Sequence, residues 1–160
     1  MDGLSINTRE RVNELQRVMS TMPQAEGLIT THHFVPGQYL RKLWRPAGTV
    51  IVGKVHKAPH FFLCALGEIA VSSGDVNWKT LQAGDVIESV PGTKRITVAL
   101  TDAIGITVHK TDLTDLDEIE AELIEPDELA LFDARNELKV PRIESTVLSI
   151  ESGNSAEKGE

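Results

Sequence analysis

The sequence TVIVGKVHKAPHFFLCALGEIAVSS, residues 49–73, decides the class of fold. It consists of short runs of β-branched and other apolar residues, separated by glycine, proline and polar residues. Similar runs extend from residue 28 to about residue 110 and end in turn signals such as SGD, QAGD and PGTK. Many short strands with no helical pattern between them are typical of an antiparallel sandwich or barrel, not of βαβ units. The sequence therefore predicts a mainly β protein built around an antiparallel β-barrel or jelly roll.

Helical patterns flank this central part on both sides. Apolar residues recur at helical spacing over residues 8–22, and the remaining positions are charged, which predicts an amphipathic helix. The same spacing returns over residues 114–123, and Pro126 suits the first turn of a second, shorter helix. The chain is accordingly divided into an N-terminal helix (1–27), the barrel (28–111), an acidic helical pair (112–137), and a C-terminal arm with a disordered tail (138–160).

The charge of the chain is unevenly distributed. The formal net charge is −8, and residues 112–137 hold eleven acidic residues against one basic residue, Arg135. Because binding of nucleic acid needs a concentrated basic face, we expect no nucleic-acid partner. No apolar run approaches the roughly 20 residues that cross a bilayer, and Cys64, the single cysteine, is expected to be a small buried apolar residue. These features predict a cytoplasmic protein with no membrane partner.

Two spaced patterns in the barrel resemble the signatures of the cupin superfamily. The first signature, G-x5-H-x-H-x3-E-x6-G, falls on Lys54, His56, His60 and Gly67 when it starts at Gly48. The second histidine of the signature is thus kept as His56. Lys54 replaces the first histidine, and His60 replaces the glutamate.

The second cupin signature, G-x5-P-x-G-x2-H-x3-N, can be laid on the chain from Gly84. Gly92 fits, Pro91 is displaced by one residue, and Arg95 takes the histidine position. The resemblance covers residues 36–110 and implies an RmlC-like jelly roll in which three of the four metal-ligand positions are substituted. In overall texture the chain also resembles small cupin proteins encoded by tailed bacteriophages, which would place it in the cytoplasm of the host.

Strand alternation and the resemblance together predict a cluster inside the barrel. Lys54 and His56 are two residues apart and share one face of the chain, as the paired histidines of the family do. A hairpin with its turn at residues 101–103 would place Arg95 opposite His109. The family pattern places the Arg95 position inside the barrel. We therefore expect two cations and three imidazoles to converge there: Lys54, His56, His60, Arg95 and His109.

Two chemical functions fit this cluster. The first is the binding of a small anionic molecule, such as a phosphate, a carboxylate or a nucleotide fragment. Arg95 would supply a forked donor and Lys54 a point charge. The second is a metal-dependent enzyme in which His56, His60 and His109 hold Zn, Fe or Mn and leave one position open. Two cations beside the metal weigh against this second function, since arginine does not deprotonate.

A third function is a non-catalytic structural or interaction module, for example one associated with a virion. In that case Lys54 would pair with an acid such as Glu88, and the acidic residues 112–137 would dock a partner. Under each hypothesis we expect a homodimer, from the resemblance and because apolar strand faces need cover. The sequence identifies no catalytic residue and leaves open whether a reaction is catalysed.

Overall fold

The structure, a computed structural model, describes residues 3–75 and 77–139. Within these ranges helix α1 (Gly3–Ser20) precedes nine strands, and helix α2 (Leu116–Leu123) follows them. The strands are β1 (Ile29–Val35), β2 (Gln38–Arg45), β3 (Val50–Val52), β4 (His60–Leu66), β5 (Glu68–Ser72), β6 (Lys79–Gln82), β7 (Val86–Ser89), β8 (Ile96–Ala99) and β9 (Ala103–Lys110).

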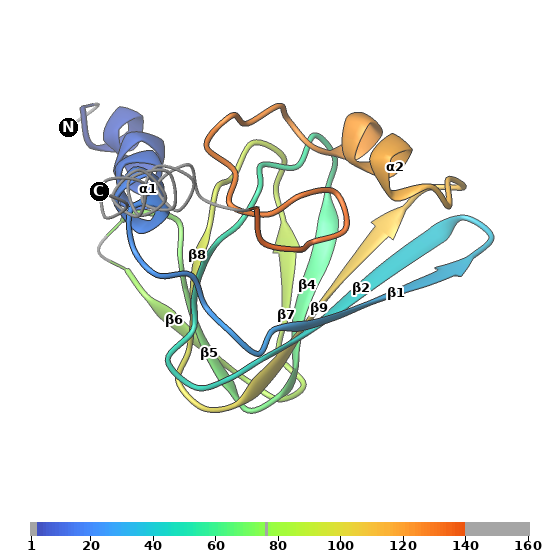
Figure 1. Ribbon diagram of the computed structural model, residues 1–160, viewed down its shortest axis with the longest axis horizontal. Coiled ribbons are helices and arrows are strands. Elements are labelled where there is room, and N and C mark those ends of the chain that lie inside the picture. Colours follow the sequence, from blue (N-terminus) through green and yellow to red (C-terminus); the bar gives the residue numbers. More distant parts are fainter. Residues whose placement is uncertain (1–2, 76, 140–160) are drawn as a thin grey trace, which may run out of the picture.

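The strands form two antiparallel sheets that face each other (Figure 1). Sheet A has the strand order β1-β2-β9-β4-β7, and sheet B has the order β3-β8-β5-β6. A core of apolar side chains from both sheets, including Phe62, Cys64, Ile69 and Leu81, fills one end of the space between them. The predicted fold class is confirmed: the protein is mainly β, with two antiparallel sheets in a jelly roll and with helices before and after them, and Cys64 is fully buried.

Helix α1 covers the outer face of sheet B. Its Val12 packs against Val52 of β3 and Ile96 of β8, so the apolar stripe of the helix is buried on the barrel. The helix begins at Gly3 and ends at Ser20, whereas the sequence predicted residues 8–22. Neither described helix is long and apolar enough to cross a membrane.

The predicted hairpin between β8 and β9 is wrong. β8 pairs with β3 and β5 in sheet B, and β9 pairs with β2 and β4 in sheet A. The short link after Ala99 carries the chain from one sheet to the other instead of reversing it within one sheet. The inward faces were nevertheless assigned correctly, because Thr97 of β8 and Thr107 of β9 both line the barrel interior.

The predicted C-terminal helical pair is also wrong in part, because the described residues form one helix after the barrel. Residues 124–139, here called the C-terminal segment, form turns and two isolated bridges. The side chain of Asp127 accepts a hydrogen bond from Leu129 N, and that of Asp133 accepts from Arg135 N and Glu137 N. Such local bonds compete with helix formation.

The C-terminal segment crosses one end of the barrel between α1 and α2 (orange in Figure 1). It therefore lies where it can close the interior. The predicted C-terminal arm and disordered tail fall, beyond residue 139, outside the described residues.

Candidate functional site

Three histidines meet at the end of the barrel that the C-terminal segment covers. His109 lies near the end of β9, opposite Tyr39 of β2, and His60 begins β4. His56 lies in the loop between β3 and β4 and forms a bridge with Ile124. Three separate pieces of chain thus place the three rings.

The three imidazole rings are in mutual contact. The ring centroids of His56 and His60 are 4.0 Å apart, those of His56 and His109 are 4.9 Å apart, and those of His60 and His109 are 4.8 Å apart. One nitrogen from each ring can be chosen so that all three lie within 4.8 Å of one another.

Burial keeps all three imidazoles neutral at neutral pH. It lowers the pKa of His56 to about 2, that of His60 to about 4 and that of His109 to about 3. Repulsion from neighbouring imidazoles and from the guanidinium of Arg41 lowers the pKa of His56 and His109 further. Neutral imidazole is the form that binds a metal ion.

Next to the histidines, a cavity of about 90 Å³ extends between the two sheets. Its wall combines apolar side chains, among them Leu43, Ile51, Phe62 and Phe132, with four cations. The cations that line the cavity are Arg41, Arg45, Lys54 and Arg95, and no carboxylate lines it among the described residues.

Arg41 and Arg45 are site residues that the sequence did not reveal. Both lie on the inward face of β2, where Arg41 is paired with Thr107 and Arg45 with Ala103. Arg45 is 3% exposed, and its guanidinium donates a 2.8 Å hydrogen bond to Thr97 Oγ1. Burial lowers the pKa of Arg45 to about 10, so it remains charged at neutral pH.

The two predicted cations have different partners. Lys54 forms an ion pair with Glu120 of α2 and donates a 3.0 Å hydrogen bond to the carbonyl of Asp133. Glu88, the acid suggested by the sequence, lies instead on the outer side of β7 beside Phe61, where it is exposed. Arg95 donates to Ser89 Oγ at 2.5 Å, and in the described part of the chain it has no acidic partner.

Three buried side-chain atoms have no hydrogen-bond partner among the described residues: Arg45 Nε, His60 Nδ1 and Thr107 Oγ1. All three belong to residues that line the cavity. Buried polar atoms without partners are rare and costly in folded proteins. Their gathering around one cavity, together with four cations and no lining acid, indicates a space shaped for a polar, negatively charged occupant.

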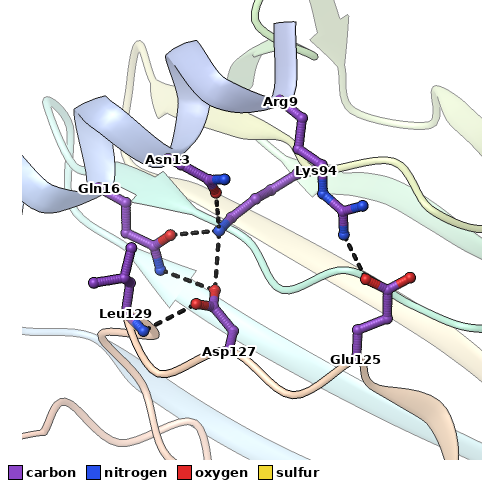
Figure 2. A network of polar contacts seen from close by, with 7 residues as sticks. All are labelled: Arg9, Asn13, Gln16, Lys94, Glu125, Asp127 and Leu129. Atoms are coloured by element: carbon purple, nitrogen blue, oxygen red, sulfur yellow. Dashed lines mark hydrogen bonds and ion pairs between the residues drawn. The ribbon is translucent and has the colours of Figure 1, made fainter. Parts of the chain in front are cut away.

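A buried ion pair between Lys94 and Asp127 lies at the centre of a network of polar contacts close to the site (Figure 2). Lys94, beside Arg95, donates to Asn13 Oδ1 at 2.7 Å, to Gln16 Oε1 and to Asp127 Oδ2 at 2.9 Å. Burial alone would raise the pKa of Asp127, but the hydrogen bonds that it accepts lower it overall. The network joins α1, the loop before β8 and the C-terminal segment.

Comparisons with known proteins find likeness in structure only. No family model and no curated protein matches the chain. An RmlC-like cupin from Shewanella frigidimarina is 24% identical and covers 54% of this chain and 80% of its own, with a TM-score of 0.46. KdgF from a Halomonas species is 17% identical, with coverages of 59% and 86% and a TM-score of 0.48. A cupin superfamily protein from Desulfitobacterium hafniense is 9% identical, with coverages of 59% and 88% and a TM-score of 0.48.

Two of these three proteins are described as cupins. At such identities the ligand and the chemistry have to be argued from the side chains of this chain.

Proposed function

We propose that the protein binds a small anionic ligand in the barrel cavity. The observation that carries this proposal is the charge of the wall, where Arg41, Arg45, Lys54 and Arg95 are opposed by one nearby acid, Glu120. A buried guanidinium without a counter-charge is costly, and a bound anion supplies that charge. The unpartnered atoms of Arg45, His60 and Thr107 favour the same kind of occupant.

A thermal-shift titration tests this proposal. We expect phosphate or a small carboxylate to raise the melting temperature at constant ionic strength, by more than chloride does, because only the folded state offers the site. Arg95→Met removes one cavity cation and is expected to abolish most of the shift. Lys79→Met removes an exposed cation of β6 far from the cavity and should leave the shift unchanged. An equal loss in both variants would indicate non-specific charge effects and contradict the proposal.

A second candidate function is metal binding at His56, His60 and His109. The donor set fits Zn, Fe or Mn, because three neutral imidazoles lie within 4.8 Å of one another and tetrahedral sites need nitrogens about 3.4 Å apart at bond lengths of about 2.1 Å. A metal ion there would supply a Lewis acid with an open position. The nearby guanidinium of Arg41 opposes a bare cation, so metal binding is expected to be stronger with an anion present.

Metal content distinguishes the two candidates. Purified protein that holds about one equivalent of Zn, Fe or Mn, and loses it in His56→Ala, would favour a metal-dependent site. Anion-dependent stabilisation of metal-free protein would favour simple anion binding. If neither ligand class shifts the melting temperature, the protein acts as a structural or interaction module without a small ligand.

We further propose that the protein works in the cytoplasm, which would be the cytoplasm of the host if it is encoded by a phage, and that it forms a homodimer. The support for dimerisation is the apolar outer face of sheet A, on which Phe61 and Val86 are about half exposed. Fractionation of the native source and a mass measurement in solution test these two proposals.

A further inference from the structure

Resting on the proposed anion site, we infer that the ligand is a small dianion with one acidic group at each end of the cavity. A short, straight-chain dicarboxylate is the simplest member of this class.

The first end is the base of the cavity, at Arg45. Its guanidinium is held in place by the hydrogen bond to Thr97, and its Nε has no partner among the described residues. Gly105 of β9 makes room for it, because a Cβ there would lie 2.6 Å from Arg45 Nη2. The described residues provide no carboxylate partner for Arg45, so this end carries a full positive charge in a space built to hold it.

The second end lies beside the histidines. Arg41 is four residues before Arg45 on the same face of β2, so their Cα atoms are roughly 13 Å apart at the rise of a strand. Arg41 lines the barrel cavity and also the small neighbouring cavity beside Tyr39, His109 and Glu120 of α2, whereas Arg45 lines only the barrel cavity of these two. Arg95 enters from the opposite wall, beside Ser89 and His60.

Apolar side chains separate the two ends. Leu43 lies between Arg41 and Arg45 on the inward face of β2, and it lines the cavity together with Ile51 and Phe62. A chain of methylene groups can pack against these three apolar side chains.

The positive charges at the two ends of the cavity favour a ligand with two acidic groups. At the histidine end Arg41, Arg95 and Lys54 are opposed by Glu120, and at the base Arg45 has no acid opposite it. A ligand with a single acidic group would leave the guanidinium at one end uncompensated. A ligand with an acidic group at each end compensates both.

Calorimetric titration with matched pairs of acids tests the inference. Each pair has the same number of carbons and differs in its second carboxylate: butanoate with succinate, pentanoate with glutarate, and hexanoate with adipate. At neutral pH and constant ionic strength, we expect at least one dicarboxylate to bind about tenfold or more tightly than its monocarboxylate partner. An optimum chain length is expected too, because the distance between the two ends is set by β2.

The base of the cavity is tested with Arg45→Met, which keeps a long unbranched side chain and removes the charge. We expect this variant to bind the preferred dicarboxylate no more tightly than the matched monocarboxylate, and to bind the monocarboxylate as the parent protein does. Lys79→Met should keep the full preference for the dicarboxylate. Circular dichroism establishes that each variant is folded. Arg45→Gln, which also removes the charge, replaces Arg45→Met if that variant does not fold.

The outcomes separate the inference from the proposed function. If the two members of every pair bind equally well to the parent protein, or if Arg45→Met weakens both by the same factor, the ligand is not a dianion that spans the cavity, although anion binding stands. If neither the carboxylates nor inorganic phosphate binds, the anion site itself is wrong and the inference fails with it.

Discussion

Gly105 lies on β9 with no side chain at the point where Arg45 and Phe62 approach its backbone. A Cβ at this position would be 2.6 Å from Arg45 Nη2 and 3.2 Å from the ring of Phe62. Gly105→Ala would therefore displace the guanidinium and break its bond to Thr97. We expect a loss of about 1–3 kcal/mol in the free energy of unfolding, as for other overpacked cores, and weaker anion binding.

Urea unfolding and an anion titration of Gly105→Ala measure these two effects. Gly53→Ala is the matched control, because its Cβ would meet nothing closer than 3.6 Å although Gly53 also lines the cavity. If Gly105→Ala binds anions as tightly as the parent protein, Arg45 does not depend on the space at this glycine.

The three buried histidines make the stability of the protein depend on pH. In the unfolded chain an imidazole has a pKa near 6.5, but in the folded protein the pKa values of His56, His60 and His109 are about 2, 4 and 3. Below pH 6.5 the unfolded state therefore binds protons at these three imidazoles, and the folded state does not. The free energy of unfolding is thus highest above pH 6.5 and decreases as the pH falls below that value. With three such groups the loss approaches about 4 kcal/mol per pH unit near pH 5.

Urea denaturation between pH 8 and pH 5 measures this dependence. We expect the free energy of unfolding to be nearly constant above pH 7 and to decline steeply below pH 6. His109→Asn should reduce the slope of the free energy of unfolding against pH by the contribution of one proton. An equal slope in the parent protein and in His109→Asn would contradict the assignment of neutral imidazoles.

At the scale of elements, the Lys94 network joins three parts of the chain that have no shared strand. Lys94→Met would leave Asp127 partly buried without its cation, and we expect a loss of about 3–5 kcal/mol in the free energy of unfolding. The double variant Lys94→Met with Asp127→Leu should recover part of this loss, because both charges are then gone. Arg9→Met breaks an exposed ion pair with Glu125 and should cost less than about 1 kcal/mol. Urea unfolding of the parent protein and the three variants measures these differences. Equal losses in the free energy of unfolding for Lys94→Met and Arg9→Met would contradict a special role for the buried pair.

The strands that were predicted well have a clear alternation of side chains. In β9 the residues on one face are small or polar and those on the other are Ile104, Ile106 and Val108, so the inward direction of Thr107 and His109 follows from the pattern. The turns between most of the other strands carry glycine or proline, which mark the ends of those strands. The fold class and the inward direction of His109 could therefore be predicted from the pattern, whereas His56 lies in a loop, where strand alternation does not apply.

Strand β2 shows why the rest of the site could not be predicted. Its sequence, QYLRKLWR, mixes apolar and charged residues on both faces, with Arg41 and Arg45 inside and Lys42 outside. Buried unpaired arginines go against the rule that charges lie at the surface, so no pattern signals them. The sequence also predicted a hairpin between β8 and β9, which lie in different sheets. A short link between two strands has the same sequence features whether the chain turns back within one sheet or crosses to the other.

At the scale of the whole molecule, the outer face of sheet A is apolar and uncovered among the described residues. Leu63, Ile106 and Val108 form its centre, and Phe61 and Val86 beside them are 49% and 52% exposed. Apolar areas of this kind mark interaction surfaces. Two charges flank the centre, Lys42 on β2 and Glu88 on β7, and they lie on opposite sides of it in the strand order.

This arrangement of charge favours a second copy of the chain as the partner of the face. A two-fold axis along the seam between β9 and β4 would bring β2 of one copy over β7 of the other, and so Lys42 near Glu88 of the partner subunit. We expect Phe61→Glu to give a monomer, because it places a charge in the apolar centre. Lys42→Glu should weaken the dimer by about tenfold through like charges, and adding Glu88→Lys in the same chain should restore it. Sedimentation over a range of concentrations measures these changes, and a parent protein that is monomeric throughout, or a charge exchange that does not restore pairing, would contradict this dimer.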